Sequence, residues 1–356
     1  MAHIELRNIT KTFGANTALK GLNLEIEDGQ FFVLLGETGA GKTTTLRIVA
    51  GLEKPTQGTV LLDGVDVGSW GAAERDVALV LQQYSLYPRY TVRENLEFPL
   101  KSKIRRVEPA EIAERVARVA KTLRIEHLMD RKTDRLSGGE MQRVSIGRAI
   151  VRKPRVFLMD EPLSALDAKL REALRTELKN LQMNLGATFL FVTHDQVEAM
   201  SMGDRIGVLD HGRLVQVGTP AEIYGNPKNT FVARAVGSPP MNLVDGAVKD
   251  GMAVAEAGFT LPVPAAGGQD GRAMTFGVRP EDLRLEPGAP VEARVHDVEN
   301  HGVEKIVTLR VGDALLRATV PAQTKVALDE TVRFAWDEHK VVLFDRASGM
   351  SLRHAS

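Results

Sequence analysis

Residues 31–43 read FFVLLGETGAGKT, an apolar run that leads directly into a glycine-rich loop. The near-continuous run Phe31–Leu35 is typical of a strand buried on both faces of a parallel sheet. Gly36–Thr43 matches the pattern G-x-x-x-x-G-K-[ST], and a helical pattern follows it. Glycines let such a loop wrap a phosphate with its N–H groups pointing inward, while Lys42 reaches the β- and γ-phosphates and Thr43 binds Mg²⁺. This stretch therefore predicts a nucleoside triphosphate site in an α/β fold.

A second buried run, Val156–Met159, ends in two acidic residues. Asp160, at the carboxyl end of a central strand, is suited to hold the hydration shell of Mg²⁺, and Glu161 to polarise a water in line with the γ-phosphate. Two acids at a strand end are by themselves more often part of a solvated loop. Downstream of a phosphate loop, the catalytic interpretation is favoured.

Composition limits the class of protein. The chain has 356 residues, with 46 Lys and Arg against 46 Asp and Glu, so its formal net charge is +0. This balance argues against a dedicated nucleic-acid binder, which usually carries a basic excess. The absence of cysteine excludes disulfides, thiol catalysis and thiolate metal sites. No apolar run approaches the ~20 residues that cross a bilayer, and the first residues lack the pattern of a signal peptide. We therefore expect a two-domain cytoplasmic protein.

The region 1–235 alternates apolar runs with helical patterns, which is the pattern of an α/β sheet. A further buried strand is expected at 189–192, and a half-exposed strand at 22–26, where apolar and polar residues alternate. Apolar stripes at helical spacing within 112–123 and 170–185 predict helices packed on the core.

The pattern changes after residue 235. Gly237–Pro240 interrupts any helix, and short alternating segments such as 306–311 and 331–336 follow, separated by turn residues. This is typical of a small all-β barrel. We place the domain boundary at 236, so that the second domain spans 236–356.

Leu136–Arg143 reads LSGGEMQR. This segment resembles the signature motif of ABC-type ATPases, which other phosphate-loop proteins lack. A serine and two glycines before a helical segment also form an anion cradle, because backbone N–H groups point outward at a helix N-terminus.

Other positions of that family are also filled. Val80–Tyr84 looks like the Q-loop, with Gln82 sensing Mg²⁺ and the attacking water. Ser164–Asp167 is similar to the D-loop, which meets its counterpart in a second copy. His194 stands where the family has the switch histidine that contacts the γ-phosphate. Phe13 stands where an aromatic ring stacks on adenine, with a plain core phenylalanine as the alternative.

The resemblance implies an ABC-type ATPase domain over 1–235, with a mixed sheet and a helical subdomain, followed by a regulatory OB/TOBE-like barrel over 236–356. It implies ATP and Mg²⁺ as cofactors. The residues that it assigns to catalysis are Glu161, His194, Gln82 and Lys42, and those that it assigns to the metal are Thr43, Gln82 and Asp160. Those that it assigns to the nucleotide are Phe13, Gly36, Glu37, Thr38, Gly39, Ala40, Gly41, Lys42, Thr43, Thr44, Ser137, Gly138, Gly139, Gln142 and Asp167.

Three segments narrow the resemblance: GSPPMN at 237–242, VRPED at 278–282 and YSLYP at 84–88. They are similar to the maltose and glycerol-phosphate group of bacterial carbohydrate importers. In that group two ATPase chains lie beneath two transmembrane permease subunits at the cytoplasmic face of the inner membrane. A separate extracytoplasmic solute-binding protein delivers the solute. A barrel of this kind often binds nucleic acid, but neutral charge and 5% aromatic residues favour a protein–protein role and no nucleic-acid partner.

The family mechanism is a split site. One chain supplies the phosphate loop, the acids and His194, and the Ser137–Gly139 cradle of a second copy closes on the γ-phosphate. Motion then passes to the permease through the surface around Gln82–Tyr90. Glu37 departs from the proline that is usual in the family, and its negative charge near the nucleotide is expected to reduce ATP affinity.

Several alternative functions fit the sequence less well. An importer ATPase for a polyamine, sulfate or a metal ion also carries a C-terminal barrel, and GSPPMN favours sugars over these. A soluble ABC protein usually has two cassettes or a coiled-coil insertion, and this chain has a single phosphate loop. A GTPase or small-molecule kinase leaves LSGGE unexplained, and a non-catalytic regulator is disfavoured by the intact Glu161 and His194. The sequence leaves open the solute, the permease partners and any regulatory ligand of the barrel.

Overall fold

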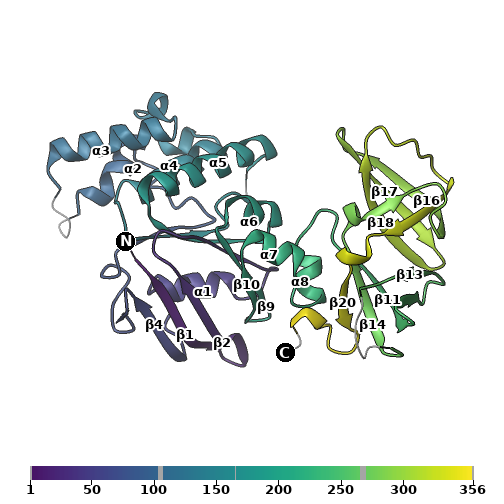
Figure 1. Cartoon of the computed structure of the whole chain (residues 1–356). Helices are drawn as coiled ribbons and strands as arrows, with labels where there is room; N and C mark the ends of the chain where they lie inside the picture. The colour runs from purple at the N-terminus through teal and green to yellow at the C-terminus, as the bar shows by residue number, and fades with distance from the viewer. Residues whose placement is uncertain (1, 103–106, 165, 265–269, 355–356) are drawn as a thin grey trace. The chain divides into compact units, whose positions relative to one another are not determined.

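The structure is a computed structural model. It describes residues 2–102, 107–164, 166–264 and 270–354. The chain divides into two compact units, 1–220 and 221–356. The compact units divide at residue 220, whereas the sequence pattern changes at 236. The domain boundary at 236 stays a prediction. Figure 1 shows mixed helices and strands in the first unit and mostly strands in the second.

A six-stranded sheet positions the predicted site. Its order is β10-β9-β3-β8-β7-β6, and all its neighbours pair in parallel except β10 with β9. The strands are β3 (Phe31–Leu35), β6 (Val77–Val80), β7 (Val156–Asp160), β8 (Thr188–Thr193), β9 (Arg205–Asp210) and β10 (Arg213–Gly218). Every residue of β3, β7 and β8 is buried, as the apolar runs predict. The carboxyl ends of parallel strands share one edge, where ligands of open α/β sheets bind.

A second, antiparallel sheet completes the strands of the first unit. Its order is β2-β1-β4-β5, and its strands are β1 (Ile4–Phe13), β2 (Asn16–Ile26), β4 (Gln57–Leu62) and β5 (Val65–Asp66). Leu22, Leu24 and Ile26 are buried while the residues between them are exposed, so the expected half-exposed strand is confirmed. These side chains share a core with α1 (Lys42–Val49) and the six-stranded sheet.

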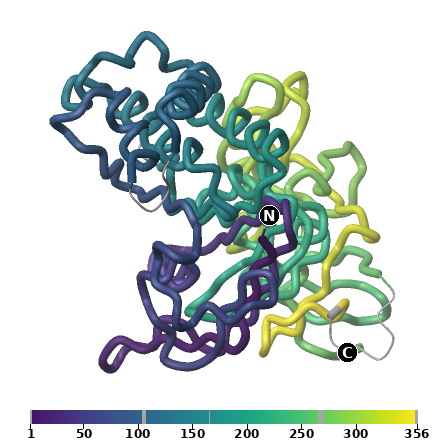
Figure 2. Tube along the Cα trace, turned by 90° about the vertical axis from the view of Figure 1, so that its left-hand side faces the viewer, coloured from purple at the N-terminus to yellow at the C-terminus, as the bar shows by residue number. Residues whose placement is uncertain are grey.

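Besides α1, which shares the core of the two sheets, the first unit has helices outside that core. They are α2 (Val92–Glu97), α3 (Pro109–Thr122), α4 (Gly138–Ile150), α5 (Ala168–Leu185) and α6 (Gln196–Met202). Figures 1 and 2 place α2, α3 and α4 at one end of this unit, away from β1, β2 and β4. The buried side chains of α3 are Ile112, Val116, Val119 and Ala120, which is the predicted stripe. Gly186 caps the C-terminus of α5, and its φ of 58° is one that glycine adopts readily at this position.

The second unit is mostly β-structure. The short helices α7 (Pro220–Gly225) and α8 (Thr230–Ala235) precede two five-stranded sheets that share one apolar core. One sheet, β13-β12-β11-β14-β20, contains β11 (Asn242–Lys249), β12 (Met252–Ala255), β13 (Thr260–Pro262), β14 (Ala273–Val278) and β20 (Val342–Asp345). The other, β15-β19-β16-β17-β18, contains β15 (Leu283–Leu285), β16 (Val291–Asn300), β17 (Glu304–Val311), β18 (Ala314–Pro321) and β19 (Thr331–Trp336). The predicted all-β second domain is confirmed.

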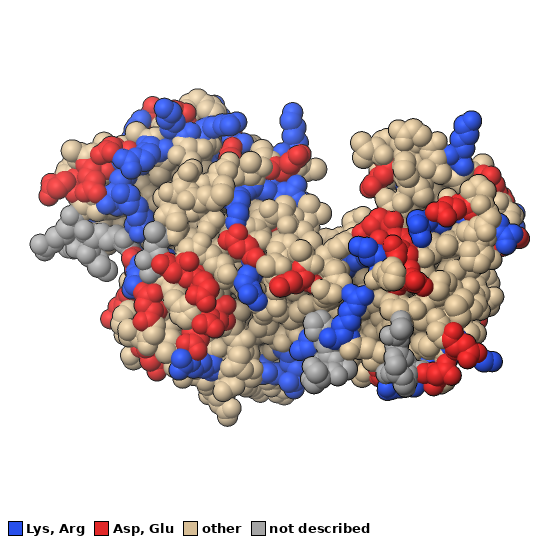
Figure 3. All heavy atoms as spheres, viewed as in Figure 1, with Lys and Arg blue, Asp and Glu red and all other residues tan. Residues whose placement is uncertain are grey.

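Acidic and basic side chains are interspersed on the face that Figure 3 shows, as the balanced composition predicts.

Candidate functional site

The glycine-rich loop lies between β3 and α1. Gly39 and Gly41 have φ angles of 85° and 107°, which L side chains rarely adopt. Space is also limited, because a Cβ on Gly36 would lie 2.5 Å from the Leu209 carbonyl oxygen and one on Gly41 2.8 Å from that of Ala18. Glycine is therefore required by conformation and by packing. Ala40 is buried, whereas Glu37, Thr38 and Gly39 are exposed along the rim of the loop.

Lys42 folds back over this loop. Only 4% of its surface is exposed, and its Nζ donates to the carbonyl oxygens of Gly36 at 2.9 Å and Glu37 at 3.0 Å. The same Nζ lies 3.4 Å from Oε1 of Glu161. The loop thus holds a desolvated ammonium group at its centre, which suits a phosphate chain.

Thr43 and Asp160 meet at the carboxyl ends of β3 and β7. The Thr43 hydroxyl donates to Oδ1 of Asp160 at 3.0 Å. Asp160 is 7% exposed, and burial raises the pKa of its carboxyl group. A hydroxyl and a carboxylate are hard oxygen ligands, so this pair fits Mg²⁺. Thr44 follows on the first turn of α1, half-buried.

Glu161 lies between Lys42 and His194. Its Oε2 is 2.9 Å from Nδ1 of His194, and its backbone N–H donates to the Val192 carbonyl oxygen at 2.9 Å. Its φ of 44° is unusual for a residue with a side chain. Strain of this kind persists where the surroundings fix a conformation, and it gathers at functional sites. The arrangement places a carboxylate between a cation and an imidazole at the sheet edge.

Gln82 follows β6 and reaches the same edge. It is exposed, and its Nε2 donates to the Ser164 hydroxyl at 3.4 Å. That hydroxyl donates to the Glu161 carbonyl oxygen at 2.9 Å. Ser164 therefore connects the predicted Q-loop to the backbone of the predicted base. Of the predicted D-loop, Ala165 lies outside the described residues, and Asp167 caps α5 by accepting from the Leu170 N–H at 2.9 Å.

The predicted signature lies at the N-terminus of α4. Ser137 is exposed and forms a capping box with Glu140, whose carboxylate accepts from the Ser137 N–H at 2.7 Å. That hydrogen bond is the main reason why the pKa of Glu140 is lowered. Gly138 and Gly139 are half-buried on the first turn, whereas Gln142 is only 1% exposed. Ser137 thus lies exposed at the N-terminus of α4, with its N–H and hydroxyl paired to the Glu140 carboxylate.

Phe13 lies at the end of β1, in the hairpin that leads into β2. It is 45% exposed, and Nζ of Lys11 lies 4.6 Å from the centre of its ring. The alternative of a core phenylalanine is therefore wrong, and stacking on adenine stays a prediction.

The structure brings together six predicted residues: Lys42, Thr43, Asp160, Glu161, His194 and, through Ser164, Gln82. Their roles in catalysis and metal binding stay predictions, as do the nucleotide contacts of the loop, of the signature and of Asp167.

Comparison with known proteins identifies the family. The family model described as ABC transporter matches residues 19–164, the MalK OB fold domain matches 237–283, and the TOBE domain matches 276–344. The trehalose/maltose import ATP-binding protein MalK of Thermococcus litoralis is 46% identical over 99% of this chain and 100% of its own length. The chain belongs to the ATP-binding subunits of ABC transporters. The sulfoquinovosyl glycerol transport ATP-binding protein SmoE of Agrobacterium fabrum is 45% identical over 99% of this chain and 100% of its own. The sn-glycerol-3-phosphate import ATP-binding protein UgpC of Brucella abortus is 45% identical over 97% of both chains.

A solved structure resembles the ATPase part of this subunit. The dimeric structure of MJ0796, a bacterial ABC transporter cassette, is 35% identical, with a TM-score of 0.56 over 61% of this chain and 98% of the cassette. Within the described residues of this ABC ATPase, no helix has the length and apolar character that crossing a membrane requires.

Sequence reasoning missed several polar residues beside the site of this ATPase. Arg171 donates a hydrogen bond to Asp195, the residue after His194. Glu198 is 2% exposed and accepts from the Thr193 hydroxyl at 2.6 Å. Burial raises the pKa of Glu198. These residues form no local motif with a chemical signature. Arg171, at the start of α5, and Asp195, in a loop 24 residues later, are not related by any sequence spacing that predicts contact.

Proposed function

We propose that this ABC subunit hydrolyses MgATP to drive import of a sugar or sugar derivative, as a homodimer beneath two permease subunits. The assembly of Lys42, Thr43, Asp160, Glu161 and His194 at one sheet edge carries the ATPase part of the proposal. The sugar part rests on full-length relatives named for import of maltose, xylose and glycerol 3-phosphate.

ATP binding follows from the loop. The backbone N–H groups of Gly39–Thr43 and the start of α1 surround the β- and γ-phosphates, and the Lys42 ammonium neutralises their charge. Thr43 and Asp160 would hold Mg²⁺, which would supply Lewis-acid stabilisation of the transferred phosphoryl group. Before nucleotide binds, Lys42 is occupied by two carbonyl oxygens and by Glu161, so binding exchanges these contacts for phosphate oxygens.

Hydrolysis needs a base and an oriented water. Glu161 accepts the proton of the water as it attacks the γ-phosphorus, and His194, 2.9 Å from Glu161, orients that carboxylate and contacts the γ-phosphate. Gln82 adds a polar group at the same edge. The Ser137–Gly139 cradle is open in one chain, and we propose that it closes the site of the partner chain.

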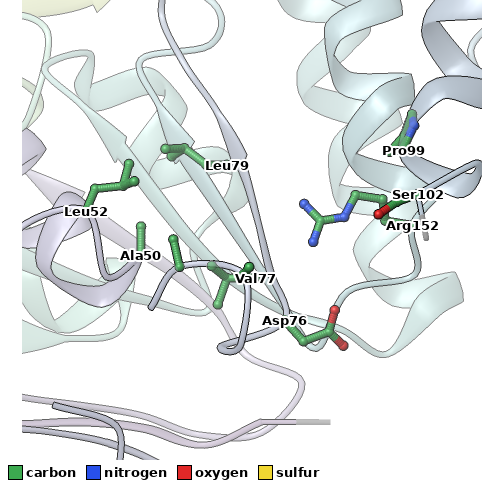
Figure 4. A pocket seen from close by; sticks show the side chains of 10 residues that line it. Ala50, Leu52, Asp76, Val77, Leu79, Pro99, Ser102 and Arg152 are labelled. Atoms are coloured by element: carbon green, nitrogen blue, oxygen red, sulfur yellow. The ribbon is translucent and has the colours of Figure 1, made fainter. Parts of the chain in front are cut away.

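We propose that the permease docks in a groove between the sheets and the helical segment. A pocket of about 630 Å³ is lined on one side by Ala50, Leu52, Val77 and Leu79, and on the other by Pro99, Ser102 and Arg152. Figure 4 shows the Arg152 side chain directed into the space between the two walls. A second pocket of about 240 Å³ shares Leu79, Pro99 and Arg152 and includes Tyr84, Ser85 and Tyr87 of the segment expected to transmit motion.

The walls of this groove fit an apolar face of a cytoplasmic permease segment. Leu52, in the larger pocket, is 54% exposed, and Phe98, in the smaller one, is 44% exposed, so both pockets present apolar side chains to a partner. Because the chain has no cysteine, Leu52→Cys provides a single thiol. We expect this thiol to react with a maleimide in the purified chain and to be protected in membranes that contain the permease. Equal labelling in both would contradict docking here.

Uptake measurements test the function as a whole. Cells that lack this chain are expected to lose ATP-dependent uptake of one labelled sugar or sugar derivative. Expression of the wild-type chain restores it, and the Glu161→Gln variant does not. Loss of uptake of a polyamine, sulfate or a metal ion instead would contradict the sugar assignment, and unchanged uptake of all of them would contradict a transport role.

A further inference from the structure

The first turn of α5 carries an arginine that joins two functional loops. Nη1 of Arg171 donates to Oδ2 of Asp195 at 3.2 Å, and Nη2 donates to the Leu166 carbonyl oxygen at 3.1 Å. Leu166 belongs to the loop that precedes α5, and Asp195 directly follows His194. One planar guanidinium group therefore spans both loops, which a lysine could not do.

The hydrogen bonds of Asp195 fix the backbone next to His194. Oδ1 of Asp195 caps α6 by accepting from the Val197 N–H at 2.7 Å, which leaves Oδ2 for Arg171. The Asp195 N–H donates to the Thr193 hydroxyl at 3.0 Å, and that hydroxyl donates to the buried Glu198. Both neighbours of His194 are thus fixed, and the orientation of its ring toward Glu161 depends on them.

The other side of the same turn packs on the signature. A Cβ on Gly139 would overlap Cδ2 of Leu170 and would lie 3.9 Å from Cδ2 of Leu166. Gly139 therefore has direct contact with the residues on either side of the α5 N-cap. Because no space separates Gly139 from Leu170, a displacement of the signature also displaces the first turn of α5.

We infer that Arg171 is a positioning residue that couples the signature of a chain to its own switch histidine. The inference rests on the proposed function, in which the signature serves the nucleotide of the partner and His194 serves that of its own chain. When ATP draws the partner onto Ser137–Gly139, the first turn of α5 moves, and Arg171 carries the displacement to Asp195 and His194. The two composite sites are thereby linked within each chain, so hydrolysis is cooperative in ATP.

If Arg171 only stabilised the fold, its substitution would mainly lower the melting temperature. The Arg171 side chain is 31% exposed, and Arg171→Gln keeps the first three carbon positions of its stem, so most of its packing remains when the guanidinium group is removed. The turn still has its cap, because Asp167 accepts from Leu170 independently of Arg171. Loss of the guanidinium group is therefore expected to change the rate and the cooperativity far more than the melting temperature.

Steady-state hydrolysis by the purified full-length chain tests the coupling. Arg171→Gln and Asp195→Asn are each expected to lower kcat about ten- to a hundredfold, since small misplacements of catalytic groups cost rates of this order. Their ATP affinity stays within about twofold, and the Hill coefficient for ATP falls to about 1. Asparagine retains the oxygen that caps α6, so Asp195→Asn removes the charge and the acceptor of Arg171 while the cap stays in place. Because both variants break the contact between Arg171 and Asp195, the double variant is expected to match the Arg171→Gln single variant, which also loses the Leu166 contact.

Two further variants separate the inference from trivial explanations. Lys169→Gln removes an exposed positive charge from the same turn and is expected to leave kcat and the Hill coefficient unchanged. Arg171→Lys retains the pairing with Asp195 but not the span to Leu166, so kcat recovers in part while the Hill coefficient stays near 1.

The outcomes distinguish this inference from the proposed function. If the wild-type chain hydrolyses no ATP, the proposed function is wrong. If it hydrolyses ATP with a Hill coefficient of 1, the coupling is wrong while the function stands. The coupling is also overturned if the Arg171 and Asp195 effects are additive, or if the variants lower only the melting temperature.

Discussion

Replacing Glu161 by glutamine is expected to separate ATP binding from hydrolysis. The side chain lies 3.4 Å from Nζ of Lys42 and 2.9 Å from Nδ1 of His194, and glutamine keeps its shape and its ability to hydrogen-bond to the histidine. What it loses is the basic lone pair that accepts the proton of the water. General-base catalysis typically contributes about 10²–10⁴ in rate, which corresponds to about 3–5.5 kcal/mol in the activation barrier.

ATP affinity is expected to be retained or to increase, because the substitution removes a negative charge beside Lys42 and the phosphates. Phosphate release at saturating MgATP measures the first effect, and titration calorimetry measures the second. Glu172→Gln, an exposed position on α5, is the matched control and should leave both quantities unchanged. A Glu161→Gln chain that binds ATP and releases phosphate within tenfold of the wild-type rate would refute the assignment of the base.

Three other changes test the site and the second unit. Lys42→Ala should weaken ATP binding about ten- to a hundredfold in calorimetry, since it removes a charged hydrogen-bond donor worth about 1.5–3 kcal/mol; unchanged affinity would argue against this loop as the phosphate site. Burial raises the pKa of Asp160, so protons compete with Mg²⁺ at higher pH than at an ordinary aspartate, and the KM for Mg²⁺ in hydrolysis should rise as the pH falls. Without metal, folding stability should change with pH in the opposite direction and fall as the pH rises. The raised pKa of Asp160 means that its contribution to stability is present below its unfolded pKa and is lost as the pH rises through its folded pKa. Asp160→Asn should abolish both the pH dependence of the KM for Mg²⁺ and that of stability. Arg279→Met removes donors to the carbonyl oxygens of Val236 at 2.6 Å and Tyr224 at 2.7 Å, so thermal unfolding should show a loss of about 1–3 kcal/mol, with ATP affinity unchanged.

Elements with a strong local pattern were predictable from the sequence. Phe31–Leu35 and Val156–Met159 are apolar throughout, which only a strand covered on both faces tolerates, and both are buried strands. The phosphate loop is also local, because left-handed φ angles at Gly39 and Gly41 require glycine at those positions. Parallel pairing then brings Asp160, Glu161 and His194 to one edge, so much of the candidate site follows from strand order.

Features that depend on packing between distant segments could not be predicted. The positive φ of Glu161 arises because its N–H pairs with Val192 while its carboxylate contacts Lys42 and His194, and no neighbour in sequence signals this. The hydrogen bond of Arg171 to Asp195 depends on how α5 packs against α6, which periodicity does not specify.

The second unit shows the same contrast. Alternation predicted strands at 306–311 and 331–336, and both lie within strands of the structure. Their order in the sheet, with β19 between β15 and β16, joins segments that are far apart in the chain and have no spacing rule. The buried Arg279 in VRPED was noticed only as part of a resemblance, whereas the structure gives it three backbone carbonyl partners.

Hydrolysis by a mixed dimer tests the split site most directly. Ser137→Arg places a bulky cation in the signature cradle, whereas Glu161→Gln removes the base, and each chain alone should be nearly inactive while still binding ATP. If the signature acts on the nucleotide of the partner, one of the two sites in a mixed dimer combines an intact phosphate loop with an intact signature. An equimolar mixture should then recover hydrolysis up to about a quarter of the wild-type rate, since half of the dimers are mixed and each has one competent site, and coupling to the blocked signature of the Ser137→Arg chain lowers the rate below that limit. A mixture that forms mixed dimers and yet hydrolyses no faster than the separate chains, or a Ser137→Arg chain that cannot bind ATP, would contradict the account.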